Sequence, residues 1–95
     1  MVAAGWRCRY GEIELVAEND KYIIFTELKL RKNAVFAPAR AFVDHKKQER
    51  VRISAQLYLL KHPSALQPRF DVAEVYAPEG TATQKPEINY IEDAF

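Results

Sequence analysis

The sequence predicts a small α/β domain in which one crossover helix packs on a mixed β-sheet. Two apolar, strand-like runs, 10–17 and 22–29, flank a short polar loop, as in a hairpin. A helical segment over 44–61 and an alternating run over 68–76 follow. Strand, helix and strand in succession imply a crossover, so the third strand should run parallel to its neighbour. With 95 residues, 48% of them hydrophobic, we expect a single globular domain over residues 1–95.

The first strand is expected to run from Trp6 to Ala17, with Gly11 allowing a bulge or bend within it. The second is expected from Tyr22 to Leu30, because this segment is rich in Ile, Phe, Thr and Tyr. A connecting loop formed by Asn19-Asp20, or by the four residues 18–21, places Ala17 opposite Tyr22. This register sets Glu12 opposite Glu27, Glu14 opposite Phe25, and Tyr10 opposite Lys29.

Four charged side chains should therefore share one face of this hairpin, since opposed residues share a face and so do residues two apart on one strand. They are Glu12, Glu14, Glu27 and Lys29. Carboxylates crowded in this way usually need a cation, and oxygen ligands suit a hard ion such as magnesium or manganese. The alternative is a solvated polar face with a surface ion pair between Glu12 and Lys29.

Asp44 is the expected N-cap of a helix that ends near Lys61, before His62-Pro63. This helix carries two apolar stripes, whereas a helix lying on a sheet needs one. We therefore expect something else to cover the second stripe, and we take a second copy of the chain as the hypothesis. The first stripe is Val51, Ala55, Tyr58 and Leu59, and the second is Ile53, Leu57 and Leu60.

The remaining segments read as connections and strands. Residues 31–41 are expected to form a loop, and 68–76 alternates like a strand. Residues 78–86 are expected to form another loop, followed by a short edge strand over 87–91.

Composition also bounds where the protein works. No apolar run approaches the roughly 18 residues that span a bilayer, so we expect no membrane association. The five residues before Trp6 are too few for a signal peptide. The lone cysteine, Cys8, cannot form an internal disulfide, and we expect it to be packed in a protein of the reducing cytoplasm.

The net charge of +1 hides an asymmetry along the chain. Between Lys29 and Arg69 there are ten Lys or Arg residues and two acids, whereas the last 25 residues are acidic. A basic surface beside a carboxylate cluster suits a polyanion such as nucleic acid, although charge runs are also typical of a solvated helix face. The expected nucleic-acid-binding residues are Arg31, Lys32, Lys46, Lys47 and Arg50.

Four blocks occur in a familiar order: 6–15 (WRCRYGEIEL), 25–31 (FTELKLR), 69–72 (RFDV) and the terminal Ala94-Phe95. Together they resemble the YraN-like family of predicted endonucleases. That family belongs to the restriction-endonuclease-like PD-(D/E)xK superfamily and is distantly similar to archaeal Holliday junction resolvases. The resemblance spans nearly the whole chain, and it implies a restriction-endonuclease-like sheet with a crossover helix.

The resemblance also implies roles for individual residues. Glu14, Glu27 and the backbone carbonyl of Leu28 would hold magnesium (or manganese), and Lys29 would orient or deprotonate the attacking water. Glu12 would be an accessory residue, and Asp71 a further candidate that an ion pair with Arg69 explains equally well. If active, the chain would be a magnesium-dependent endodeoxyribonuclease that hydrolyses phosphodiester bonds in DNA.

This chain departs from the family pattern in two places. Family members usually have Asp at the position of Glu14, and magnesium demands near-ideal geometry. They also usually carry an N-terminal helix before the first strand, and we expect none within this sequence, which begins almost at that strand. The competing interpretation is therefore a catalytically eroded nuclease fold that serves nucleic-acid binding or protein interaction. A structural module without a polyanion partner is the third.

Overall fold

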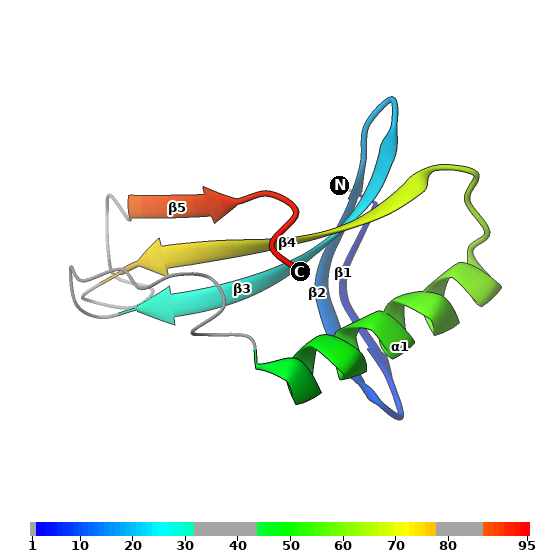
Figure 1. Cartoon of the computed structure of the whole chain (residues 1–95), viewed down its shortest axis with the longest axis horizontal. Coiled ribbons are helices and arrows are strands. Elements are labelled where there is room, and N and C mark those ends of the chain that lie inside the picture. The colour runs from blue at the N-terminus through cyan, green and yellow to red at the C-terminus, as the bar shows by residue number, and fades with distance from the viewer. Residues whose placement is uncertain (1, 32–43, 78–86) are drawn as a thin grey trace.

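Five strands form a single mixed sheet with one long helix beside it (Figure 1). The computed structural model describes residues 2–31, 44–77 and 87–95. The sheet has the order β1-β2-β3-β4-β5, and β3 and β4 are parallel while the other pairs are antiparallel. The expected crossover and mixed α/β class are confirmed, and the architecture is compatible with a small restriction-endonuclease-like fold. The elements are β1 (Ala3–Cys8), β2 (Gly11–Glu18), β3 (Tyr22–Arg31), α1 (His45–Lys61), β4 (Gln67–Tyr76) and β5 (Glu87–Ile91).

The long first strand expected from Trp6 to Ala17 is wrong, because the chain reverses in its middle. β1 ends at Cys8 and pairs with β2, with Cys8 opposite Gly11. Gly11 has a φ of 153°, a conformation that side-chain-bearing residues rarely adopt. The glycine that was expected to allow a bulge therefore closes a hairpin between two separate strands.

The register predicted between β2 and β3 is also wrong, by two residues. Ala17 pairs with Ile24 rather than with Tyr22. The side chain of Asn19 accepts hydrogen bonds from the amides of Lys21 and Tyr22, at 2.9 and 2.7 Å, which moves the turn along the chain. Because side chains alternate with a period of two, a slip of two residues leaves the face of each side chain unchanged.

The two hairpin-linked strands separate along their length. Pairing of β2 with β3 runs from the loop to Leu15 opposite Thr26 and no further. Figure 1 shows the β1–β2 hairpin turned steeply across the direction of β3, β4 and β5. The beginning of β2 therefore parts from the end of β3.

Helix α1 packs by its first apolar stripe on the face of the sheet that carries Phe25. The ring of Tyr58 meets Trp6 and Phe25 edge-on, with centroids 5.4 and 5.9 Å apart. The expected N-cap is confirmed, because the Asp44 side chain accepts a hydrogen bond from the Lys47 amide at 2.8 Å. The core cluster contains Ile13, Val16, Ile23, Phe25, Ala55 and Tyr58.

In the second apolar stripe of α1, Ile53 is 39% and Leu60 77% exposed, whereas Leu57 is half-buried. No helix in the described ranges is long and apolar enough to cross a membrane. The expected edge strand is confirmed as β5. The loop expected over 31–41, beyond its first residue, and the loop expected over 78–86 lie outside the described residues.

Candidate metal centre between β2 and β3

Glu14 and Glu27 approach each other where β2 parts from β3. One further step of the β2–β3 register would set these two residues opposite each other. Backbone pairing has ended there, and Glu14 instead uses its side chain, whose Oε2 accepts a hydrogen bond from the Leu28 amide at 2.9 Å. The carbonyl of Leu28 points to the same edge of β3 as its amide, because both groups of one residue share an edge in an extended strand. The register and this hydrogen bond thus place two carboxylates and one backbone carbonyl at the same part of β3.

Glu27 is buried, with only 4% of its surface exposed, and two lysines form ion pairs with it. Lys47 Nζ lies 2.5 Å from Glu27 Oε1, and Lys29 Nζ lies 3.8 Å from the same oxygen. Lys47 comes from the first turn of α1, which the Asp44 cap fixes. The interaction therefore ties the start of the helix to the middle of β3.

Burial and the neighbouring charges shift the pKa values of three side chains in this cluster. Burial, and then the charge of Glu27, raise the pKa of Glu14, although the hydrogen bond from Leu28 opposes them. Burial, and then the neighbouring Lys47, lower the pKa of Lys29. Burial also acts to lower the pKa of Lys47, but its hydrogen bond to Glu27 outweighs this and raises it. Lys29 is thus the lysine that gives up its proton more readily.

The accessory candidate Glu12 lies at the solvent edge of this cluster. Its Oε2 accepts a hydrogen bond from Arg7 Nε at 3.1 Å, across the β1–β2 hairpin. The solvated surface pair envisaged for Glu12 is thus with Arg7, not with Lys29. Burial of Glu27 shows that its part of the face is not solvated.

Asp71 lies on the opposite face of the sheet from Glu27. It pairs in register with Thr26, so its side chain alternates away from the carboxylate cluster. Both of its oxygens are bound by the guanidinium of Arg69, at 3.0 and 2.8 Å. Tyr90 Oη and the Asp93 amide also donate to it, at 2.5 and 2.9 Å. This fully buried carboxylate ties β4 to the C-terminal segment, as the ion-pair interpretation expected.

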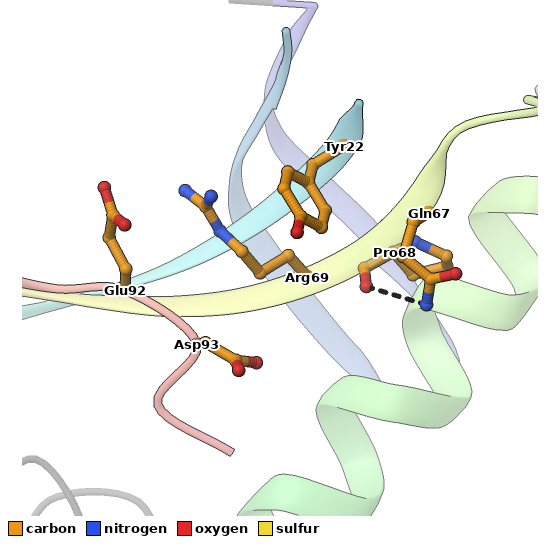
Figure 2. A pocket seen from close by; sticks show the side chains of 6 residues that line it. All are labelled: Tyr22, Gln67, Pro68, Arg69, Glu92 and Asp93. Carbon is orange, nitrogen blue, oxygen red and sulfur yellow. Dashed lines mark hydrogen bonds between the residues drawn. The ribbon is translucent and has the colours of Figure 1, made fainter. Parts of the chain in front are cut away.

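A pocket of about 380 Å³ opens beside Arg69 and Asp93, which bind Asp71 (Figure 2). Figure 2 shows the Arg69 guanidinium beside the ring of Tyr22, whose centroid is 5.0 Å from Arg69 Cζ. Since the Arg69 charge is already matched by Asp71, this pocket offers a phosphate little and is separate from Glu14 and Glu27. It is lined by Tyr22, Gln67, Pro68, Arg69, Glu92 and Asp93.

The predicted nucleic-acid-binding residues divide into two groups. Lys46 and Arg50 are exposed on α1, whereas Lys47 is turned inward to Glu27. Arg31 ends β3, and its side chain, together with Lys32, lies outside the described residues.

One residue of the centre escaped the sequence analysis. Glu74 is fully buried and pairs in register with Lys29, so the two share a face of the sheet. The signal was present in the strand over 68–76, where Phe70 and Val72 occupy the same face and Glu74 stands at the next position of that apolar row.

The donor set can be tested for its fit to a metal. Across 2–31, 44–77 and 87–95, no three His, Cys, Asp or Glu side chains are grouped to hold one. The converging set is instead two carboxylates and the Leu28 carbonyl, all oxygen donors of the type that magnesium takes together with water. Glu27 already binds one cation, the Lys47 ammonium. The residues fit a hard divalent ion.

Comparison with known proteins identifies close relatives of this chain. A family model described as "Uncharacterised protein family UPF0102" matches residues 1–75. A UPF0102 protein of Caldicellulosiruptor bescii is 36% identical over 97 residues, which cover all of this chain and 80% of the relative. One from Xanthomonas campestris is 35% identical, over all of this chain and 75% of the relative. One from Acetivibrio thermocellus is 39% identical, over 92% of this chain and 68% of the relative.

Proposed function

The chain belongs to the uncharacterised protein family UPF0102, and we propose that it is a metal-dependent endonuclease that hydrolyses phosphodiester bonds in DNA. The observation that carries this proposal is the meeting of Glu14, Glu27 and the Leu28 backbone where two strands part. A lysine, Lys29, lies beside them. The order of acid, acid and lysine is the one that the resemblance to PD-(D/E)xK nucleases implies.

We assign Glu14, Glu27 and the Leu28 carbonyl to the binding of magnesium or manganese. When bound, such an ion would polarise the phosphate and supply a nucleophile near neutral pH. The longer side chain of Glu14, in place of the Asp usual in the family, is supported by the Leu28 amide. That hydrogen bond fixes Oε2, and we assign the other oxygen to the metal.

We assign Lys29 to the attacking water and to the charge that develops on the phosphate. Its lowered pKa favours a general base, since a base works best when its pKa approaches the working pH. Its side chain is 25% exposed, so a substrate can reach it from solvent.

The proposed partner is a polyanion, and DNA is the one we favour. Lys46 and Arg50 stand exposed on the same helix whose first turn brings Lys47 to Glu27. Phosphates bound by these side chains would lie close to the carboxylates.

The half-buried thiol of Cys8 donates to Ser54 Oγ at 3.3 Å, and this free cysteine fits the proposed cytoplasmic setting.

The test is a cleavage assay on duplex, single-stranded and branched DNA with magnesium or manganese. We expect cleavage that needs the metal and is lost in Glu27→Gln and in Lys29→Met. Glu18→Gln, an exposed charge change in β2, is the matched control and should cleave as the native chain does. Cleavage that survives Lys29→Met would refute the assignment.

We also propose that two copies of the chain associate through the second stripe of α1. The exposure of Ile53 and Leu60 supports this. Sedimentation should give a dimer at micromolar concentration that Leu60→Glu converts to a monomer, and a native chain that sediments as a monomer would refute it.

A further inference from the structure

Glu74 is a buried carboxylate for which the proposed mechanism has no use. It has no exposed surface, and neither of its Oε atoms has a hydrogen-bond partner among residues 2–31, 44–77 and 87–95. Burying a charge without a partner is unfavourable, so such groups are normally paired or neutral. A buried carboxyl of this kind is either neutralised by a proton or held by a cation within reach of its side chain.

Lys29 is that cation by position. The two residues are directly paired in the parallel β3–β4 register and project from the same face. Adjacent strands lie about 4.8 Å apart, and the four-carbon stem of a lysine spans that distance easily. Glu27, the other carboxylate beside Lys29, precedes it by two residues on the same strand. Lys29 thus stands between two acids.

Glu27 is already occupied by another cation. Its Oε1 lies 2.5 Å from Lys47 Nζ but 3.8 Å from Lys29 Nζ, so Lys47 is its principal partner. If a divalent ion binds Glu27, the attraction between Lys29 and that carboxylate weakens further. Lys29 makes no ion pair with Glu74 in the structure, so the pairing requires its side chain to turn from Glu27 toward β4, where Glu74 is the acid in register with it.

We propose that Glu74 is a positioning residue that pairs with Lys29 and fixes the direction of its ammonium group. This inference adds a residue to the proposed function and rests on it for the role of Lys29, but the pairing itself requires no metal. It also gives the centre three carboxylates, Glu14, Glu27 and Glu74, against two lysines. One divalent cation would turn that net charge from −1 to +1, which suits an incoming phosphate.

The test is a double-mutant cycle on the unfolding equilibrium in urea, with Glu74→Gln, Lys29→Met and the double variant. We expect a coupling on the order of tenfold in the unfolding equilibrium constant. If Glu74 were only an uncompensated buried charge, Glu74→Gln would stabilise the chain equally with Lys or Met at position 29. Such additivity would overturn the proposal.

A second readout follows Lys29 directly, by mass spectrometry after brief amine labelling. Labelling of Lys29 should become several-fold faster in Glu74→Gln, should slow again in Glu74→Asp, and should not change in Glu18→Gln. Equal labelling in the native chain and in Glu74→Gln would contradict the pairing.

Melting with manganese separates this inference from the proposed function. Glu74→Gln should retain the metal-induced rise in Tm, because it removes no proposed ligand. Loss of that rise in Glu74→Gln alone would make Glu74 a ligand and overturn its positioning role. If the native chain itself shows no rise, the metal site fails, while the cycle and the labelling still decide for or against Glu74.

Discussion

The Oε2 atom of Glu14 accepts a hydrogen bond from the Leu28 amide at 2.9 Å, at the point where β2 and β3 cease to pair. A side chain thus replaces a rung of the sheet. The replacement keeps the Leu28 amide satisfied while two carboxylates come together, which regular pairing alone would not provide. The candidate centre depends on this separation of the strands.

Two substitutions of Glu14 should divide its structural contribution from its charge. Glu14→Ala leaves the partly exposed Leu28 amide without its acceptor, and we expect a loss of about 0.5–1.5 kcal/mol in the free energy of unfolding. Glu14→Gln retains an acceptor and removes the repulsion from Glu27, so it should cost less than half as much. Urea unfolding without metal measures both, and equal losses would show that the hydrogen bond contributes nothing.

Lys47 should act as an internal substitute for the divalent ion. Lys47→Met leaves buried Glu27 without its nearest cation, and we expect a destabilisation of about 1–3 kcal/mol, moderated because the lysine is partly exposed. The same variant should gain more Tm from manganese than the native chain does, since no ammonium competes. Lys46→Met, its exposed neighbour, is the control. A smaller metal-induced rise in Lys47→Met than in the control would contradict this competition.

Asp71 should give the fold a defined sensitivity to acid. Burial opposes its ionisation, but hydrogen bonds from Arg69, Tyr90 and the Asp93 amide outweigh this and lower its pKa below the ordinary value of 3.8. A carboxyl with a lowered folded pKa stabilises the protein above its unfolded pKa, and that stability is lost as the pH falls through the folded value. Asp71→Asn should therefore be less stable at pH 7 and show a flatter stability profile below about pH 4. Urea unfolding from pH 7 to pH 2 measures it, and parallel profiles would refute the role.

DNA binding should depend on salt through the exposed residues of α1. Removing one phosphate contact, by Lys46→Ala or by Arg50→Ala, should reduce the slope of log affinity against log salt by about 1. Lys21→Ala, in the β2–β3 turn, should leave the slope unchanged. Binding titrations by fluorescence anisotropy at several salt concentrations measure these slopes. Unchanged slopes for both helix variants would place the DNA elsewhere.

Sequence reasoning reached the helix, its cap and the mixed sheet because these depend on local signals. Asp44 before an amphipathic segment marks a helix start wherever the segment packs. It missed the β1–β2 turn, because Gly11 is compatible both with a bulge and with a reversal, and only the pairing of Trp6 with Ile13 decides between them. The predicted register was wrong by two residues because the side chain of Asn19 sets the turn through its own hydrogen bonds.

The error of two residues in the predicted register does not change the face assigned to Glu14, Glu27 and Lys29, because side chains alternate with a period of two. The sequence pattern did not predict the partners of two other residues in the cluster, although the apolar row of Phe70 and Val72 indicates the face on which Glu74 lies. In the sequence, Lys47 is one of several charges in a basic run, and only the position of α1 in the fold brings it to Glu27. Glu74 lies opposite Lys29 through a parallel pairing of residues that are 45 positions apart, which no local signal reports.

The most direct test of the account is calorimetric titration of the native chain, Glu27→Gln and Glu18→Gln with manganese and magnesium. We predict one divalent ion per chain for the native protein and for Glu18→Gln, and no binding for Glu27→Gln. No binding by the native chain at millimolar metal, or equal binding by Glu27→Gln, would contradict a metal centre at Glu14 and Glu27. Either result would favour a nuclease fold whose site has eroded.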